Sequence, residues 1–352
     1  MLKIIFKYIF NTEGKTRKRA VEVLAVIFIV GIISFTLYNH LGDDGPQVSS
    51  KRVFMMDTTF EIVLYSTDED QGNRLIDEAY NEARNLEKVL SRFISNSDVD
   101  RINRNAGIEP VEVDPVTFHV VEKAIHFSEI SEGSFDVTVA PLLKLWGFGT
   151  GEHSVPTEEE IKEVLPLVDY KKIEIEEDNL TVFLQEEGMS IDLGGIAKGY
   201  IVDHVAQYLE EHGAKSAFVN AGDIRALGNK PDGTPWVIGV RHPRQREVNI
   251  GVIPISNESI DTSGDYERFF IEDGKRYHHI IDPHTGKPTR EMLSVTVVSP
   301  DCVAADTLST AAFVLGPEKG LELLEELPEV EGFLFDVNEE LYITSGLKDI
   351  MK

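Results

Sequence analysis

The order of helix and strand patterns along the chain constrains its fold more than any other feature. Apolar residues alternate as in a strand pair over residues 52–66, whereas residues 75–95 and 115–133 have helical apolar spacing. Strand patterns fill residues 216–299, and a helix is predicted directly after them, over residues 303–316. Because the two patterns mix without a strict βαβ rhythm, we predict an α+β fold, with mixed sheets and packed helices.

The N-terminal part carries a membrane signal. A basic cluster, Lys15 to Arg19, precedes an apolar run of 16 residues from Val23 to Tyr38. Residues 20–22 bring this run near the roughly 20 residues with which a helix spans a bilayer. An uncleaved signal anchor is favoured, because no Ala-x-Ala-like site follows the run, and a cleaved signal peptide is the alternative.

These signals predict four segments. Residues 1–19 form a short basic cytoplasmic segment, 20–38 a signal-anchor transmembrane helix, 39–51 a linker, and 52–352 a folded domain. Basic residues stay on the cytoplasmic side of an anchor, so the large domain is expected on the extracytoplasmic side of the cell membrane.

Charge and cysteine content exclude several classes of function. The net charge is −27, and residues 1–50 carry six basic and four acidic groups, so the remainder carries −29. Such a surface repels nucleic acid, and an anionic ligand would need backbone N–H groups, a metal ion or a few placed cations. The single cysteine, Cys302, allows no intramolecular disulfide and no cysteine metal cluster, and its apolar context predicts a packing residue.

The stretch "SIDLGGIAKGY" could bind a phosphate. A strand is predicted to end at Asp192, two glycines follow, and a helix runs over residues 195–213 with Lys198 near its start. Glycines allow a ligand to approach the backbone, and a helix N-terminus offers free N–H groups. The alternative is a tight turn without a ligand, since this is neither a Walker loop nor a dinucleotide fingerprint.

The stretch "CVAADTLSTAAF" places oxygen ligands on one helix face. Asp306 and Thr310 are four residues apart, and Ser309 is adjacent. A carboxylate and a hydroxyl that converge in this way suit Mg²⁺. The alternative is an aspartate that caps the helix, with hydroxyl groups bonded back to its carbonyls.

Two further stretches combine aromatic and polar residues. In "GSFDVTVAPLLKLWGFG" a predicted β-run follows Asp136, and the aromatic residues could hold a flat ring or form a core strand and turn. The stretch "RYHHIIDPHTGKP" has three histidines within seven residues, so a general base competes with a structural histidine.

Taken together and in this order, seven stretches resemble the FAD:protein FMN transferase family, also called the ApbE family. They are "SRFISNSDVDRIN", "GSFDVTVAPLLKLWGFG", "IDLGGIAKGYIVD", "FVNAGDIRALG", "TSGDYERFF", "HHIIDPHTGKP" and "SVTVVSPDCVAADTLSTAAFVLG". The resemblance covers roughly residues 52–346, so the predicted domain 52–352 would be the FMN transferase catalytic domain. It implies FAD as substrate and Mg²⁺ as cofactor. The pyrophosphate is split, FMN is joined to a threonine (or serine) hydroxyl of a target flavoprotein, and AMP leaves.

The resemblance also implies roles for particular residues. The metal ligands would be Asp306, Thr310, Ser309 and the carbonyl of Gly195. The flavin contacts would be Met56, Phe93, Ser134, Phe135, Asp136, Asp192, Lys198 and the backbone near Ile280. Asp306 would also be catalytic, and His279 would be the reactive histidine that orients or deprotonates the acceptor hydroxyl.

Two departures and several alternatives accompany this resemblance. A single Gly222 precedes Asp223 where the family has two glycines, and Asp57 follows Met56 where a glycine is usual. By analogy the acceptors would be subunits of Rnf- and Nqr-type electron-transport complexes. The alternatives are an FAD pyrophosphatase that releases FMN and AMP, a non-catalytic FAD-binding module, and a membrane-anchored adhesion domain.

Overall fold

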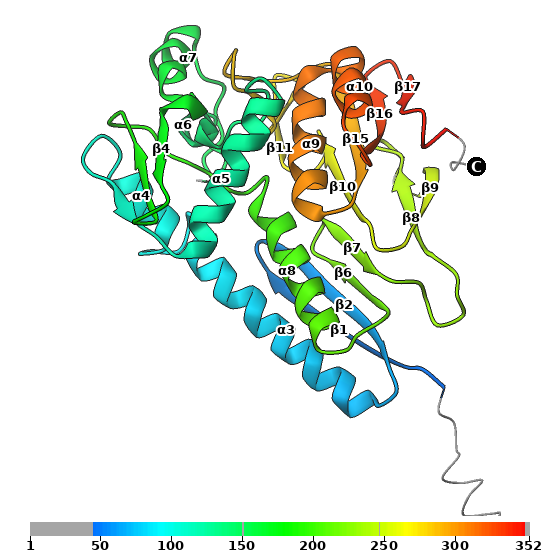
Figure 1. The fold of residues 1–352 in the computed structure, drawn as a ribbon. Helices are drawn as coiled ribbons and strands as arrows, with labels where there is room; N and C mark the ends of the chain where they lie inside the picture. Colours follow the sequence, from blue (N-terminus) through cyan, green and yellow to red (C-terminus); the bar gives the residue numbers. More distant parts are fainter. Residues whose placement is uncertain (1–44, 150, 246, 349–352) are drawn as a thin grey trace, which may run out of the picture. The chain divides into compact units, whose positions relative to one another are not determined.

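Eight strands of the described chain pair into one antiparallel sheet, which forms the centre of the fold (Figure 1). The structure is a computed structural model that describes residues 45–149, 151–245 and 247–348. The strand order is β1-β2-β6-β7-β10-β15-β16-β17. These strands are β1 (Gln47–Met55), β2 (Thr58–Ser66), β6 (Ala217–Asn220), β7 (Ile224–Leu227), β10 (Ser259–Gly264), β15 (Met292–Ser299), β16 (Glu331–Asp336) and β17 (Leu341–Ile343).

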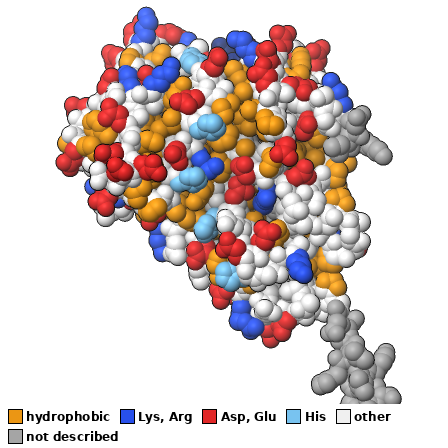
Figure 2. Space-filling model, viewed as in Figure 1, with side chains coloured by type: hydrophobic (Ala, Val, Ile, Leu, Met, Phe, Trp, Pro, Cys, Tyr) orange, Lys and Arg blue, Asp and Glu red, His pale blue; other side chains and the backbone are white. Residues whose placement is uncertain are grey.

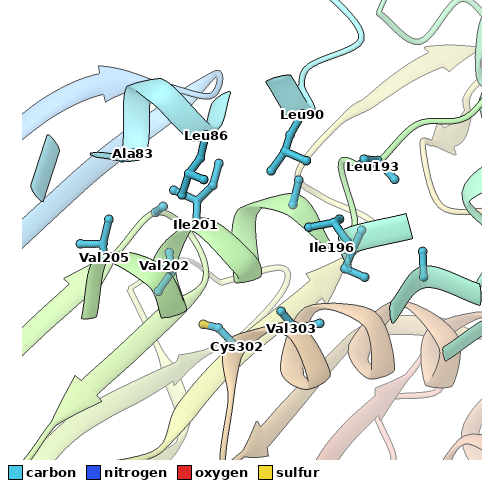
Figure 3. Packing of buried hydrophobic residues seen from close by; sticks show 14 of the residues in the cluster. Ala83, Leu86, Leu90, Leu193, Ile196, Ile201, Val202, Val205, Cys302 and Val303 are labelled. Carbon is cyan, nitrogen blue, oxygen red and sulfur yellow. The ribbon is translucent and has the colours of Figure 1, made fainter. Parts of the chain in front are cut away.

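Helices pack on one face of this sheet and bury the main core. The helices are α3 (Glu69–Leu90), α8 (Ala197–Glu211), α9 (Cys302–Leu315) and α10 (Pro317–Glu326). Figure 3 shows where α3, α8 and α9 meet: Leu86 and Leu90 of α3 lie near Ile201 of α8, and Val303 of α9 lies beyond it. Cys302 is fully buried here, which confirms the prediction of a packing residue.

A two-stranded ribbon covers the other face of the sheet. It consists of β8 (Trp236–Arg241) and β9 (Asn249–Ile255), and its Trp236 and Ile253 pack with Ile260 of β10. Successive side chains of a strand point to opposite faces, so Asp261 and Ser263 of β10 face the helices. This alternation determines which residues of β10 can reach the site described below.

Smaller elements surround one end of the sheet and α9. They are α4 (Asp98–Arg104), α5 (Pro115–Ile130), α6 (Ala140–Leu145), α7 (Glu158–Val164), β3 (Val111–Glu112), β4 (Ile173–Glu176), β5 (Thr181–Leu184), β11 (Phe269–Glu272), β12 (Lys275–His278), β13 (Ile281–Asp282) and β14 (Lys287–Pro288), with 3₁₀ turns at Val137–Val139, Leu165–Leu167 and Tyr170–Lys172. Strands β3, β5 and β4 form a three-stranded sheet, and β11 pairs with β12 as a hairpin.

The α+β fold is as predicted, but three local predictions are wrong. No strand ends at Asp192, since residues 190–193 have no regular structure. The backbone N–H and carbonyl of Ile191 bond the side-chain amide of Asn103 instead of a neighbouring strand. The β-run predicted after Asp136 is a 3₁₀ turn followed by α6, since Pro141 suits the first turn of a helix. The linker predicted over 39–51 includes the first residues of β1, which begins at Gln47. The helix predicted over 75–95 is present, with the bounds Glu69–Leu90.

The predicted membrane segment lies outside the described residues. Residues 1–44 are not among them, so the predicted anchor at 20–38 is not described. Within residues 45–149, 151–245 and 247–348, no helix is long and apolar enough to cross a bilayer.

Candidate active site

Helices α8 and α9 approach each other very closely near their N-termini. A Cβ atom at Gly199 would lie 2.5 Å from the carbonyl oxygen of Cys302, so only glycine allows this contact. The carboxylate of Asp203, one turn further along α8, accepts the N–H groups of Cys302 (2.9 and 2.8 Å) and Val303 (3.1 Å). A carboxylate at a helix N-terminus satisfies free donors and complements the helix dipole. Together these residues align the first turns of the two helices.

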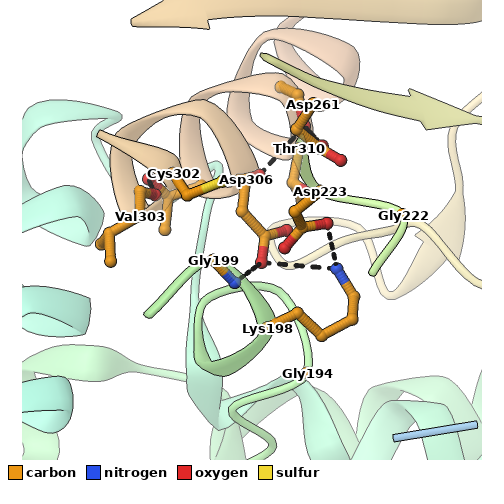
Figure 4. Close-up of polar contacts among 12 residues, drawn as sticks. Gly194, Lys198, Gly199, Gly222, Asp223, Asp261, Cys302, Val303, Asp306 and Thr310 are labelled. Atoms are coloured by element: carbon orange, nitrogen blue, oxygen red, sulfur yellow. Dashed lines mark hydrogen bonds and ion pairs between the residues drawn. The ribbon is translucent and has the colours of Figure 1, made fainter. Parts of the chain in front are cut away.

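This alignment brings a lysine and three aspartates together in a buried cluster (Figure 4). Asp306 of α9 accepts the N–H of Gly199 (3.3 Å) and lies 3.5 Å from the ammonium nitrogen of Lys198. Lys198 also pairs with Asp223, which follows β6, at 2.6 Å. One carboxylate oxygen from each of Asp223, Asp261 and Asp306 lies within 4.8 Å of the other two.

The protonation of this cluster reflects burial and mutual repulsion. Burial, with repulsion from a neighbouring carboxylate, raises the pKa of Asp223 and of Asp261 to about 7. Burial raises the pKa of Asp306 to about 6, although Lys198 opposes this. Burial alone would lower the pKa of Lys198, but the carboxylates of Asp223 and Asp306 raise it above its usual value. The cluster therefore holds more carboxylate groups than one ammonium group can neutralise.

The cluster has the chemistry of a site for a hard divalent cation. All three carboxyl groups are buried, and one oxygen of Asp223 has no hydrogen-bond partner. A buried oxygen without a partner is costly, and a cation with oxygen ligands would satisfy it. The residues present thus fit Mg²⁺.

Hydroxyl groups continue the site along α9 and β10. The Ser309 hydroxyl donates to Asp261 (2.7 Å) and lies 3.0 Å from the carbonyl oxygen of Asp306. The Ser263 oxygen lies 2.9 Å from that of Ser309 and 3.1 Å from that of Thr310. A Cβ atom at Gly195 would lie 3.9 Å from the Thr310 hydroxyl oxygen, so the turn before α8 lies close to Thr310. The predicted metal ligands are therefore close together.

The glycine turn before α8 is held by Asp192. One oxygen of this carboxylate accepts the N–H of Gly194 (2.8 Å), and the other lies 2.8 Å from Nε of Arg92. No side chain caps the N-terminus of α8. The N–H groups of Ile196 and Ala197 donate to the Leu193 carbonyl (3.0 and 2.7 Å), so part of the turn's donors are already used within the protein, and the phosphate site stays a prediction.

Two predicted flavin contacts are aromatic. Phe93 is 65% exposed, and the guanidinium of Arg92, which pairs with Asp192 of the glycine turn, lies 4.4 Å from the centre of its ring. Phe135 is buried, and its ring would lie 3.3 Å from a Cβ atom at Gly195. An exposed ring on one side and a buried ring on the other could hold a flat ligand.

Asp136 and Ser134 have structural surroundings. One oxygen of the Asp136 carboxylate accepts the N–H (2.8 Å) and the hydroxyl (2.6 Å) of Thr138, and the other accepts the N–H of Tyr170 (2.9 Å). Burial raises the pKa of Asp136. Ser134 is buried, and its N–H donates to the carbonyl of Ser131 (3.0 Å). The Asp136 carboxylate therefore caps the 3₁₀ turn Val137–Val139.

His279 is oriented by one backbone carbonyl. Its backbone N–H donates to the Arg268 carbonyl (3.0 Å), and its ring nitrogen Nδ1 lies 3.3 Å from the same oxygen. If Nδ1 carries the proton, Nε2 is left as an acceptor. Burial, together with the positive charge of Arg268, lowers the pKa of His279, so the ring is neutral at neutral pH. Phe148 packs edge-on at 6.3 Å between ring centres.

The turn between β1 and β2 forms an ion pair with Arg268, the residue whose carbonyl orients His279. Asp57 lies 3.4 Å from the Arg268 guanidinium, and the Met56 N–H donates to Glu87 of α3 (3.0 Å). Both Met56 and Asp57 have positive φ angles, 52° and 58°. A glycine would adopt these angles without strain, so Asp57 adds strain to the turn.

The remaining histidines of this stretch have other surroundings. His278 is buried, and its Nε2 lies 2.8 Å from the Thr289 carbonyl oxygen, in accord with a structural role. His284 is exposed in the turn that Asp282 holds through the N–H of His284. Ile280 is buried, and its carbonyl accepts the Thr289 N–H (3.3 Å).

Sequence reasoning missed several residues of this site. Asp223 was noted only for the glycine before it, and Asp261, Ser263 and Arg92 had no role. One usable signal was present: "IDTSG" places Asp261 and Ser263 two residues apart on one strand, and hence on the same face.

Comparison with known proteins assigns the chain to a family. The model of the ApbE family matches residues 56–334. An FAD:protein FMN transferase of Klebsiella pneumoniae is 35% identical over 302 residues, which are 85% of this chain and 92% of that protein. One from Treponema pallidum is 36% identical over 290 residues, or 78% of this chain and 80% of that protein. The chain therefore belongs to the ApbE family.

Solved structures agree with this assignment. The crystal structure of the ApbE protein from Thermotoga maritima has a TM-score of 0.81 and 35% identity, and the match covers 87% of this chain and 100% of that one. The flavin transferase ApbE from Vibrio cholerae has a TM-score of 0.78 and 32% identity, with 87% and 100% covered.

Proposed function

We propose that this protein is an FAD:protein FMN transferase. The observation that carries the proposal is the buried cluster of Asp223, Asp261, Asp306 and Lys198 beside the glycine turn of α8. A cation site next to a glycine turn and a helix N-terminus suits a diphosphate. Curated relatives that match over most of their length are FAD:protein FMN transferases by name.

The reaction joins a hydroxyl to the flavin-side phosphorus of FAD. A bond forms between this phosphorus and the oxygen of an acceptor threonine or serine, and the bond to the bridging oxygen breaks. AMP leaves with that oxygen and its electron pair, and the hydroxyl proton goes to a base. A bound Mg²⁺ would neutralise the charge that develops on the phosphate oxygens.

The chain's own residues would divide the remaining tasks. We propose that Asp306, Thr310 and the Gly195 carbonyl hold the cation, with Ser309 beside them. Lys198 and the N–H groups of the glycine turn would bind phosphate oxygens. Phe93 and Phe135 would border the flavin, with Met56, Ser134, Asp192 and the backbone of Ile280 completing the flavin site.

We assign the proton transfer to His279. Its neutral ring, with Nδ1 turned to the Arg268 carbonyl, leaves Nε2 free to accept the proton of the acceptor hydroxyl. A threonine hydroxyl is a poor nucleophile until a base removes its proton. His279→Ala should therefore abolish transfer and leave FAD binding intact. Equal loss of both would refute this role.

The test of the function is the mass of an acceptor. The protein is incubated with FAD, Mg²⁺ and an FMN-binding domain that carries a Ser/Thr-rich acceptor segment. A gain of one FMN, lost in EDTA and in Asp306→Ala but kept in Thr307→Val, would establish the transferase. Thr307 suits as a control because its buried hydroxyl bonds only carbonyls of its own helix. Release of FMN and AMP without a mass gain would identify a pyrophosphatase, and untouched FAD a binding module.

The location and the acceptor complete the proposal. We propose that residues 20–38 anchor the protein in the cell membrane, which the basic cluster before the apolar run supports. The catalytic domain would then meet its acceptors outside the cytoplasm. Subunits of Rnf- and Nqr-type complexes are the acceptors that the family resemblance suggests.

A further inference from the structure

The hydroxyl groups of Ser309, Ser263 and Thr310 follow one another in a chain of hydrogen bonds that starts at Asp261. It runs through Ser309 of α9 and Ser263 of β10, with oxygen–oxygen distances of 2.7, 2.9 and 3.1 Å. Each hydroxyl has one hydrogen to donate, so the direction of every bond depends on the next. The chain therefore has an order that can be derived from its end.

The end at Asp261 sets the direction. The Ser309 hydroxyl lies 2.7 Å from a carboxylate oxygen of Asp261 and 3.0 Å from the carbonyl oxygen of Asp306, and neither is a donor when Asp261 is ionised. In both contacts the Ser309 hydroxyl is the donor. The Ser309 hydrogen therefore points away from Ser263.

The direction then passes to Thr310. Because Ser309 donates its only hydroxyl hydrogen to Asp261, its contact with Ser263 is a hydrogen bond only if Ser263 donates. Ser263 has then no hydrogen left for Thr310, so their contact requires Thr310 to donate. A threonine that donates to Ser263 turns its lone pairs the other way. Those lone pairs are what a cation binds.

We propose that Ser263 is a positioning residue that fixes the Thr310 hydroxyl with its lone pairs toward the cation site. This proposal rests on the cation site of the proposed function and adds to it a residue that touches neither cation nor substrate. Without Ser263, the Thr310 hydrogen can turn toward its own helix or into the site. A ligand that must be reoriented before binding weakens metal affinity, and partners of this kind are worth about tenfold or more.

The experiment measures Mn²⁺ binding as a substitute for Mg²⁺, from the free Mn²⁺ signal in electron paramagnetic resonance. Ser263→Ala should weaken binding about tenfold. Ser263→Thr, which keeps the hydroxyl, should restore it to within about threefold. The control Thr307→Val should bind as the wild type does. Urea unfolding of each variant shows whether the fold is equally stable, so that a loss of affinity is not a loss of folded protein.

A double-mutant cycle tests whether Ser263 acts through Thr310. In a Thr310→Val background, Ser263→Ala should change affinity by less than about twofold, because there is no hydroxyl left to orient. An equal tenfold loss in both backgrounds would overturn the proposal, as would unchanged binding in Ser263→Ala. A wild type that binds no Mn²⁺ would overturn the cation site itself, and this inference with it.

Discussion

The close contact between α8 and α9 can be tested by adding one methyl group at Gly199. In Gly199→Ala the Cβ atom would lie 2.5 Å from the Cys302 carbonyl oxygen and 3.0 Å from the Val303 nitrogen. Both are backbone atoms of a packed helix, so neither can rotate away. Carbon atoms in contact prefer about 3.5 Å or more, so the helices must separate by about 1 Å.

Two opposing terms set the size of the effect. Alanine is favoured over glycine inside a helix by about 1 kcal/mol. Overpacking of a tight interface costs about 1–3 kcal/mol. Because the obstacle is backbone, we expect the upper part of that range and a net loss of about 1–2 kcal/mol in the free energy of unfolding. Separation would also lengthen the 3.3 Å bond from Gly199 to Asp306, so cation affinity should fall as well.

The assay is urea unfolding of the purified protein, with Gly72→Ala as the matched control. Gly72 is also helical, but its Cβ atom would meet the hydroxyl oxygens of Ser49 (2.5 Å) and Ser66 (2.7 Å), which are side-chain ends that can rotate. The control should therefore lose less stability than Gly199→Ala, although the two hydroxyls must leave their bonds to the carbonyls of Glu69 and Asp68. If Gly199→Ala is as stable as the wild type and binds Mn²⁺ equally, the backbone contact does not align the site, and the reasoning is refuted.

Three further predictions concern the same elements. The raised pKa values of Asp223, Asp261 and Asp306 favour the protonated forms, so stability without metal should fall as pH rises from about 4, where these groups ionise in the unfolded chain, to about 7, where they ionise in the folded protein. Mg²⁺ should then raise the melting temperature more at pH 8 than at pH 5, by differential scanning fluorimetry. Asp203→Ala should lower the free energy of unfolding by about 1–2 kcal/mol in urea, since the N–H groups of Cys302 and Val303 lose their acceptor at the start of α9, where Asp301 caps only Ala304. Because the pKa of His279 is lowered, kcat/KM of wild-type transfer should not fall near pH 6.5 when it is measured as a function of pH. A fall of kcat/KM near pH 6.5 in the wild type that is absent in His279→Gln would contradict this prediction.

The sequence predicts most elements because local patterns determine them. The strand pair of β1 and β2, the helices α5, α8 and α9, and the hairpin of β16 and β17 all have clear periodicity. The errors fall where tertiary contacts decide. The β-branched residues after Asp136 suggest a strand, but their carboxylate neighbour caps a 3₁₀ turn. Asp192 was placed at a strand end, yet its partners are Gly194 and Arg92.

The site was partly predictable for a similar reason. Asp306 and Thr310 share a helix face by spacing alone, so the sequence could place them together. Asp223 lies in the turn between β6 and β7 and Asp261 on β10, so strand order determines whether they meet. No local pattern encodes that order, because β7 pairs with β10 across more than thirty residues of intervening chain. The buried cluster therefore follows from topology.

The charge of the cluster explains why a strongly acidic protein can bind an anion at this point. Acidic side chains are spread over the face seen in Figure 2, with Lys and Arg side chains among them, and the net charge of the chain is −27. Inside, three carboxyl groups face one ammonium group, and without a cation the excess is removed by protons, as the pKa values near 6–7 indicate. A divalent cation would replace those protons and bring the cluster near neutrality, with its remaining coordination positions open to phosphate oxygens. FAD should accordingly bind weakly until the cation is present, because the single ammonium group of Lys198, which lies between Asp223 and Asp306, does not neutralise three carboxylates by itself.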